Sequence, residues 1–263
     1  GLGGRLDATN VVERPLVCGI ASLGVDHQQF LGRRLVGIAA EKAGIAKVGV
    51  PLVTQRYPPA IAKQIGAIAN DLGAVWLPRG GPWDATVSRG KLRYRDRAGS
   101  LDLPLPRLPG RHQAMNAALA VAMLRHQDRL EVPPSALSAA MDWADWPARL
   151  QSLAPGPLTK LLPAGSELWI DGGHNPSAAR AIAAYARKSL TAELPLTLVF
   201  ASLASKDPKG MLEPFQGIAA AVRTVPIADH EFRPPEELAA LAHAMGFDAS
   251  AHATLGDALG AIR

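Results

Sequence analysis

The stretch 16-LVCGIASLGVDHQQFLG-32 decides the fold class of this chain. Its first eight residues, 16–23, form an apolar run with the length of a buried strand, and a helical pattern follows from about Gln29 to Lys47. A second apolar segment, VPLVT, comes directly after Gly49. This strand–helix–strand order predicts an α/β domain.

The alternation of strands and helices continues toward the middle of the chain. A helix is predicted from Pro59 to Leu72, and the segment AVWL that follows it reads as a strand. The basic segment SRGKLRYRDR at 88–97 alternates charged residues with others, which favours a solvated β-hairpin over a nucleic-acid patch. A long alanine-rich helix is expected from Arg111 to His126, and a shorter helix after the Pro-Pro pair at 133 and 134.

The segment DWADWPARLQSL interrupts the helical pattern and marks a domain boundary. We expect residues 1–147 to be one domain and residues 148–263 to be a second α/β domain with a mostly parallel sheet. The expected strands of the second domain are ARLQSL, ELWID, LTLVFA and VRTVPI, and its expected helices span about Ser177–Leu190, Lys209–Ala221 and Pro235–Met245.

Composition limits the class of protein. The chain has 263 residues, a hydrophobic content of 48% and a net charge of +5, but its arginines are scattered, which argues against a nucleic-acid partner. The single cysteine, Cys18, excludes an internal disulfide and suits a reducing, cytoplasmic location. No apolar run of 18 residues and no signal peptide is present, so neither membrane insertion nor export is indicated.

Polar residues that follow strands are the first candidates for a site, because ligands of open α/β sheets bind beyond the carboxyl ends of the strands. Asp26 and His27 follow the strand at 16–23, and the imidazole suits metal binding or proton transfer, although a loop histidine is more often a surface residue. In DGGHNP, Asp171 ends a strand and His174 projects after two glycines, whereas helix initiation explains the Asn-Pro pair that follows.

Three further polar residues stand out by their positions. Lys42 shares a helix face with Leu35 and Ile38, so it either snorkels or is a reactive amine facing a site. Asn116 is a polar residue in an otherwise apolar helix, which predicts a buried amide that needs either a structural partner or an adenine edge. Arg149, at the domain junction, is placed to reach phosphates.

No phosphate loop of the form G-x-x-x-x-G-K-[ST] is present in the sequence. The opening GLGGRLDATN does not fit G-x-G-x-x-G either, because Leu6 stands where the last glycine is required.

Seven motifs together identify the family that the chain resembles: GLGGRLDATN, SLGVDHQQFLG, EKAGI, HQAMNAALAVA, WPARLQ, DGGHNP and ASLASKD. In this order and spacing they resemble folylpolyglutamate synthase / dihydrofolate synthase, of the Mur ligase superfamily. The resemblance implies an ATP-dependent ligase that adds L-glutamate to dihydropteroate or tetrahydrofolate through an acyl phosphate, with Mg²⁺ at the phosphates. It also implies a monomer and a fold of two parts: part of the central ATPase domain, then a Rossmann-like carboxy-terminal domain.

Site roles follow from the matched motifs. The resemblance implies that His27 binds magnesium and that Lys42 becomes carbamylated and helps to place the metal. It assigns ATP contacts to Asn116, Arg149 and Asp171, and it places Arg5 and Asp7 beside the pterin substrate. His174 lies in a motif that implies a catalytic role, and Lys206 in one that implies substrate binding.

The chain departs from the family pattern in two respects, of which the first bears on activity. The strand with a magnesium-binding glutamate and the phosphate loop, which the family has before GLGGRLDATN, are not in the sequence, so we expect an internal fragment that is inactive by itself. WPARLQ has alanine where the family usually has glycine, and DGGHNP has glycine where the family usually has alanine. Each change replaces one small residue by another and casts little doubt on the motif. Another Mur-type ligase, or a nucleotide-binding module without catalysis, remains an alternative.

Overall fold

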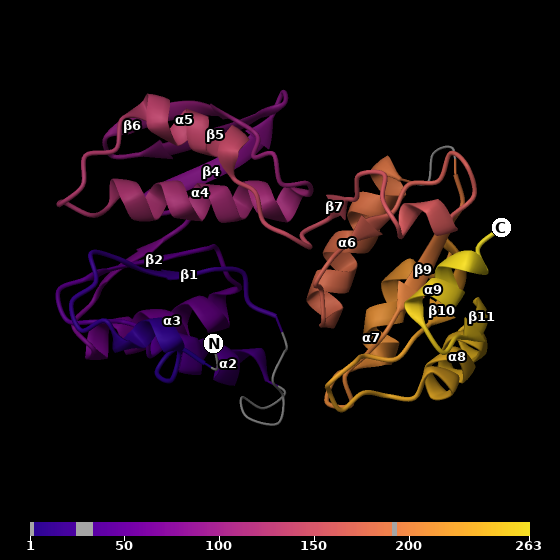
Figure 1. Ribbon diagram of the computed structural model, residues 1–263. Helices are drawn as coiled ribbons and strands as arrows, with labels where there is room; N and C mark the ends of the chain where they lie inside the picture. The colour runs from indigo at the N-terminus through magenta and orange to yellow at the C-terminus, as the bar shows by residue number, and fades with distance from the viewer. Residues whose placement is uncertain (1–2, 25–33, 191–193) are drawn as a thin grey trace. The chain divides into compact units, whose positions relative to one another are not determined.

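The computed structural model describes residues 3–24, 34–190 and 194–263. The chain divides into two compact units (Figure 1). Unit 1 comprises Gly1–Arg107 and Arg111–Asp145, and unit 2 comprises Leu108–Gly110 and Trp146–Arg263. Each unit has an α/β architecture with a three-stranded parallel sheet, as the sequence predicted.

Unit 1 contains two sheets and four α-helices among its described residues. Its elements are η1 (Ala8–Val11), β1 (Cys18–Ile20), α2 (Leu35–Ala43), β2 (Pro51–Thr54), α3 (Pro59–Asp71), β3 (Val75–Pro78), β4 (Trp83–Ser88), β5 (Lys91–Asp96), β6 (Gly99–Pro104), α4 (Arg111–Arg125) and α5 (Pro134–Trp143). The parallel sheet has the order β1-β2-β3 and the antiparallel sheet the order β4-β5-β6.

The parallel sheet of unit 1 is buried on both faces. In β2, Leu52 belongs to a core cluster with residues of α2 and α3, whereas the next residue, Val53, belongs to a second cluster with α4 and the antiparallel sheet. Both side chains are fully buried. This alternation follows from the two-residue period of a strand, and it explains why VPLVT reads as a continuous apolar run.

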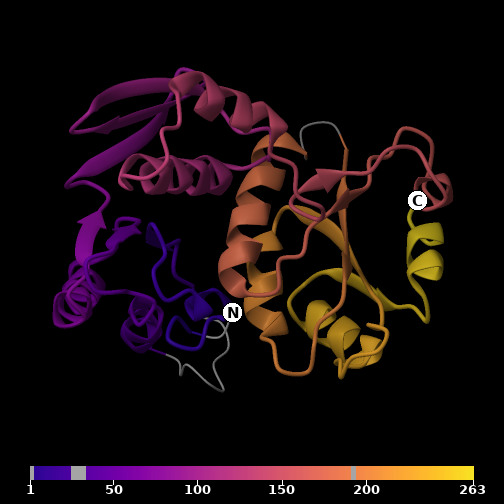
Figure 2. The same cartoon turned by 60° about the vertical axis from the view of Figure 1, so that its left-hand side comes forward.

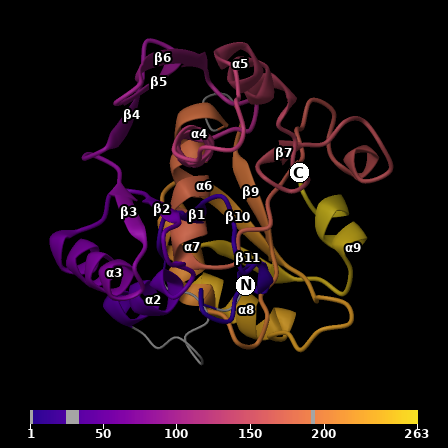
Figure 3. The ribbon, with the colours of Figure 1, turned by 90° about the vertical axis from the view of Figure 1, so that its left-hand side faces the viewer.

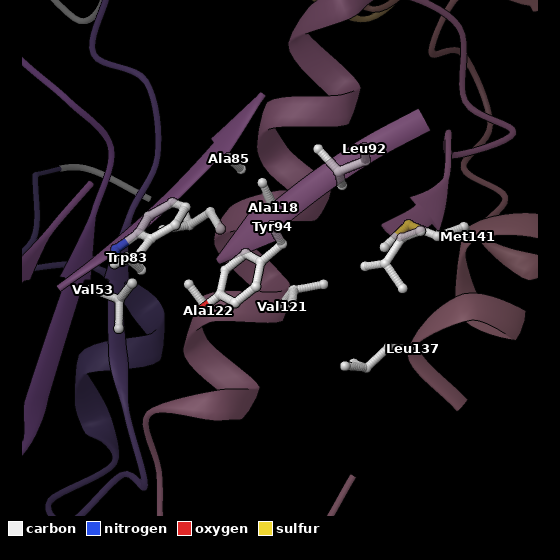
Figure 4. Packing of buried hydrophobic residues seen from close by; sticks show 12 residues of the cluster. Val53, Trp83, Ala85, Leu92, Tyr94, Ala118, Val121, Ala122, Leu137 and Met141 are labelled. Atoms are coloured by element: carbon white, nitrogen blue, oxygen red, sulfur yellow. The ribbon is translucent and has the colours of Figure 1, made fainter. Parts of the chain in front are cut away.

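Helix α4 lies between the two sheets, as Figures 1 and 2 both show. The antiparallel sheet packs its inner face on this helix through Trp83 and Tyr94, whose rings stack with centroids 6.0 Å apart (Figure 4). The outward residues of β5 alternate with these and are exposed, as the charge pattern of 88–97 predicted. That segment is not an isolated hairpin, because β6 adds a third strand.

Unit 2 has the parallel order β11-β10-β9 and a separate two-stranded sheet. Its elements are β7 (Gln151–Ser152), η2 (Thr159–Leu161), β8 (Trp169–Ile170), α6 (Pro176–Ser189), β9 (Leu196–Phe200), α7 (Pro208–Leu212), η3 (Glu213–Phe215), β10 (Ala219–Thr224), α8 (Pro235–Ala244), β11 (Asp248–Ala251) and α9 (Leu255–Gly260). Figure 3 shows α6 and α7 beside β9 and β10; residues of α6, α7 and α8 share one core cluster with the sheet.

Three expectations for unit 2 are wrong. The helix expected at Lys209–Ala221 is two short helical segments that end at Phe215, and the strand β10 already begins at Ala219. Proline at 214 and glycine at 217, the latter with φ of 75°, end the helical run. The strands in ARLQSL and ELWID pair with each other antiparallel and not with the parallel sheet.

Among residues 3–24, 34–190 and 194–263, no helix has the length and apolar character that crossing a membrane requires.

Candidate functional site

The opening glycine-rich stretch is bound to the carboxyl end of α2. The backbone N–H groups of Gly4 and Arg5 both donate to the carbonyl of Glu41, at 2.9 and 3.3 Å. A Cβ on Gly4 would collide with the carbonyl oxygen of Lys42, so only glycine permits this approach. The stretch therefore adds two donors to a carbonyl at the helix end that also accepts from the N–H of Gly44, at 3.3 Å.

Lys42 lies at this same end of α2. Its neighbours Ala39 and Ala43 are fully buried, and Lys42 itself is half-buried, as its alignment with the apolar face predicted. The contact of Gly4 and Arg5 with the preceding residue, Glu41, brings the opening stretch next to Lys42.

Arg5 and Asp7 are each held by short-range contacts. The guanidinium of Arg5 lies 3.5 Å from the Glu41 carboxylate, in an exposed ion pair. Asp7 precedes the short helix η1, and its Oδ1 accepts hydrogen bonds from the hydroxyl of Thr9 at 2.7 Å and from its backbone N–H at 3.0 Å. These hydrogen bonds lower the pKa of Asp7, so the carboxylate is negatively charged at neutral pH.

Tyr57 and Gln55, which the sequence did not single out, make hydrogen bonds at the carboxyl edge of the parallel sheet in unit 1. The hydroxyl of Tyr57 donates to the carbonyls of Ile20 and Ala21, at 2.9 and 2.6 Å, and fixes the backbone where β1 ends. Burial raises the pKa of this phenol strongly, which keeps it a donor. Only its place after a strand could have marked Tyr57 in advance. His27 lies outside the described residues.

Asn116 stands near this edge but is not buried. Gln55, directly after β2, donates from Nε2 to the carbonyl of Met115 at 2.6 Å, which ties α4 to the end of β2 next to Asn116. Asn116 itself is exposed and donates from Nδ2 to Gln113 Oε1 at 3.1 Å. The expectation of a buried amide is wrong, because the buried face of α4 consists of Ala114, Ala118, Leu119, Val121 and Ala122.

In unit 2, Asp171 closes the turn that carries Arg149. Its Oδ2 accepts from the backbone N–H of Leu150 at 2.8 Å, and its Oδ1 accepts from Gly173 at 2.6 Å. Ala148 and Leu150 flank the exposed Arg149, and both have left-handed backbone conformations, with φ of 55° and 45°. A site at the edge of the parallel sheet was expected here, but Asp171 follows β8 of the two-stranded sheet.

The rest of DGGHNP is a helix start. Asn175 accepts a hydrogen bond from the N–H of Ala178 at 2.9 Å, and Pro176 occupies the first helical position of α6, both as predicted. His174 is exposed, with Nδ1 2.9 Å from the carbonyl of Gly172. Lys206 lies in the loop between β9 and α7, and it is half-buried.

Within each unit, the structure brings some of the candidate residues together. In unit 1, Arg5, Asp7 and Lys42 lie at the carboxyl end of α2. In unit 2, Asp171 and His174 lie in the turn before α6, and Asp171 is hydrogen-bonded to the turn that carries Arg149. Within residues 3–24, 34–190 and 194–263, no cluster of three His, Cys, Asp or Glu side chains is arranged to hold a metal. Exposed Arg149 offers guanidinium donors for an anion, and exposed Asn116 an amide that can both donate and accept.

Comparison with known proteins finds relatives that are named folylpolyglutamate synthase or dihydrofolate synthase. No family model matches the chain. A folylpolyglutamate synthase of Lacticaseibacillus casei is 32% identical over 238 residues, which are 86% of this chain and 52% of that protein. A dihydrofolate synthase/folylpolyglutamate synthase of Escherichia coli is 33% identical over 213 residues, which are 81% and 46%.

Solved structures show the same relationship. E. coli FolC in complex with DHPP and ADP matches with a TM-score of 0.82 and 28% identity, over 98% of this chain and 57% of that one. A bifunctional folylpolyglutamate synthase/dihydrofolate synthase with Mn, AMPPNP and L-glutamate bound matches with a TM-score of 0.79 and 28% identity, over 98% and 58%. The chain spans about half the length of the relatives it matches.

Proposed function

Because this chain is a homologue of the folylpolyglutamate synthases and dihydrofolate synthases of the Mur ligase family, we propose that it is part of an ATP-dependent ligase. The ligase joins L-glutamate to the carboxylate of dihydropteroate, tetrahydrofolate or both. The observation that carries the proposal is the structural match over 98% of this chain to a homologue that holds DHPP and ADP.

The proposed reaction has two chemical steps. The substrate carboxylate takes the terminal phosphoryl group of ATP, which releases ADP and gives an acyl phosphate. The amine of glutamate then attacks the acyl carbon, loses a proton and expels phosphate, so that an amide bond forms. Magnesium, when bound, offsets the negative charge of the phosphates.

The end of α2 is proposed as the substrate and metal side of the site. Lys42, half-buried beside two fully buried alanines, is proposed to become carbamylated, which turns a cationic side chain into an anionic one that helps to place the metal. His27 is proposed as a magnesium ligand. The carboxylate of Asp7, kept ionised by its hydrogen bonds to Thr9, and the guanidinium of Arg5 are proposed to orient the pterin substrate.

Nucleotide contacts are proposed for Asn116, Arg149 and Asp171. The exposed Arg149 suits a phosphate, and the exposed amide of Asn116 suits an adenine edge. Each oxygen of Asp171 keeps a lone pair beside its backbone hydrogen bond, which leaves it able to accept from a ribose hydroxyl. His174 is proposed to act in catalysis and Lys206 to bind substrate. A monomer in the cytoplasm is part of the proposal.

Phosphate release, measured with the longer polypeptide that is expected to contain this chain, tests the proposal. We expect release that needs ATP, dihydropteroate or tetrahydrofolate, and L-glutamate together, and none with muramyl-peptide precursors. Release with muramyl substrates alone would make the protein another Mur-type ligase. Tight binding of ATP-magnesium in a calorimeter without any turnover would make it a non-catalytic nucleotide-binding module.

A further inference from the structure

Three guanidinium groups of unit 1 converge on one carboxylate, that of Asp84 on β4. Arg79 Nε lies 3.0 Å from Oδ1, while Arg56 Nη2 and Arg95 Nη2 lie 3.6 and 3.9 Å from Oδ2. The three arginines come from different elements, since Arg56 follows β2, Arg79 follows β3 and Arg95 is the cross-strand partner of Asp84 on β5.

The arginines differ in how far their donors are used. Arg79 is fixed, because it donates to Asp84 and also to the carbonyl of Ala85, and its side chain is 21% exposed. Arg56 and Arg95 are 63% and 75% exposed, and their distances to Asp84 exceed hydrogen-bond length. In the described part of the chain neither of these two guanidinium groups donates a hydrogen bond, so their N–H groups are available to a ligand.

The guanidinium of Arg56 lies against the backbone of Gly80. Gly80 has φ of 91°, and a Cβ at that position would collide with the Arg56 guanidinium. The glycine therefore leaves room for the arginine to lie against the main chain beside Arg79. Arg79 directly follows β3 and Arg56 is the second residue after β2, at the sheet edge where α/β proteins bind their ligands.

The single carboxylate of Asp84 cannot neutralise three guanidinium groups, and Asp96, the other carboxylate that lines the neighbouring cavity, does not pair with them. An open cavity of about 440 Å³ is lined by Asp84, Arg95, Asp96 and Arg97. Asp96 is already paired, because both of its oxygens accept from Arg125, at 2.6 and 2.8 Å. The cavity thus lies beside a cluster in which three guanidinium groups share one carboxylate.

We propose that Arg56, Arg79, Arg95 and Asp84 form a binding site for a small anion with two or more carboxylates. No residue of this site belongs to the set proposed for the ligase reaction, and the inference does not depend on that reaction. Asp84 shows that a carboxylate fits among the three guanidiniums, which match carboxylates through paired N–H donors. A ligand with several carboxylates uses Arg56 and Arg95 together, whereas a monocarboxylate uses one of them.

Titration calorimetry of citrate into the 263-residue chain, in a buffer of low ionic strength, tests the site. We expect saturable binding that Arg56→Gln and Arg95→Gln each weaken about threefold to tenfold and that the double variant abolishes. Asp84→Asn is expected to strengthen binding severalfold, because it removes the competing charge and keeps Oδ1 as an acceptor. Acetate is expected to bind at least about tenfold more weakly than citrate.

Arg93→Gln is the matched control, since Arg93 lies on the same exposed face of β5 but pairs with Asp102, at 3.8 Å. It should leave citrate binding unchanged. Equal weakening by Arg93→Gln would reduce the effect to general surface charge and overturn the site. Inorganic phosphate that binds as tightly as citrate would overturn the ligand class, and the absence of saturable citrate binding would overturn the proposal as a whole.

Discussion

The carboxylate of Asp171 holds Leu150 in a left-handed conformation, across 21 residues of chain. Its Oδ2 accepts the backbone N–H of Leu150 at 2.8 Å, and φ of Leu150 is 45°. Leu150 is 3% exposed, so its side chain is anchored in the core while the neighbouring Arg149 projects outward. Asp171 therefore positions Arg149, whether or not it also contacts a nucleotide.

Asp171→Asn should lower the free energy of unfolding by about 1–3 kcal/mol, because an amide has one acceptor oxygen for the two N–H groups that the carboxylate now serves. Urea denaturation measures this. Asp248→Asn is the control, since Asp248 is 70% exposed and pairs with Arg223 on the surface, where the loss should stay below about 1 kcal/mol. Equal losses in the two variants would show that Asp171 does not fix the turn.

Ala148→Gly should stabilise the chain by about 0.5–1 kcal/mol. Ala148 has φ of 55°, a conformation that costs alanine about 1 kcal/mol and glycine almost nothing. This gives a physical reason for the glycine that the resembling family usually has in WPARLQ. Ala144→Gly is the control, because φ there is −60° and glycine should destabilise. The urea midpoints of the two variants should shift in opposite directions. A downward shift in both would show that the backbone of Ala148 is not strained.

Arg125→Gln should destabilise unit 1 by about 3 kcal/mol at pH 7, and by less as the pH falls. Burial raises the pKa of Asp96, but hydrogen bonds from Arg125 and Tyr94 outweigh it, so the pKa lies below its usual value. The pair thus stabilises above the pKa of an unfolded aspartate, about 3.9, and this contribution is lost as the pH falls through the lower folded value.

Without Arg125, the Asp96 side chain, which is 3% exposed, is a buried unpaired charge whose pKa rises. It then takes up a proton in mild acid, which relieves the penalty. Urea denaturation at pH 7 and pH 5 measures the difference. Arg129→Gln is the control, since Arg129 and Asp128 are 77% and 96% exposed, and no change is expected at either pH. A penalty that is independent of pH would contradict the mechanism.

Lys42→Ala should abolish turnover of the longer polypeptide, and added bicarbonate should not restore it, because no amine remains to carry a carbamate. Lys42→Glu should retain part of the activity, since it supplies a carboxylate at a similar place. Carbon-13 NMR after equilibration with labelled bicarbonate should show a carbamate that Lys42→Ala removes. Lys63→Ala, at an exposed position of α3, should change neither readout. Full activity in Lys42→Ala would refute the role.

The parallel sheets were predictable because buried strands carry a local signal. The run VPLVT is apolar on both faces, and helices cover both faces of β2. The strand β11 was not predicted, since DASA has little apolar character and owes its place to pairing with β10. Likewise, β6 exists because it completes the ladder with β5, a contact that no short window of sequence contains.

The burial or capping role of a candidate residue could be predicted where it depends only on neighbours within one helical turn. Lys42 is half-buried, as its spacing from Ile38 implied, and Asn175 caps α6. The same reasoning wrongly predicted that the amide of Asn116 is buried, because the buried face of α4 consists mostly of small residues and does not include position 116. The role of Asp171 in the Arg149 turn depends on backbone groups distant in sequence, which side-chain patterns do not reveal.

The hydrogen bonds from Gly4 and Arg5 to the Glu41 carbonyl attach the opening stretch to the carboxyl end of α2. Because these bonds join main chain to main chain, the spacing between residues 4–5 and Lys42 is a property of the backbone and does not depend on which side chains occupy positions 5 and 42. Any displacement of the carboxyl end of α2 therefore carries both segments the same distance. Substitutions at positions 5 and 42 therefore change the chemistry of either segment without removing these main-chain hydrogen bonds, whereas position 4 has to remain glycine.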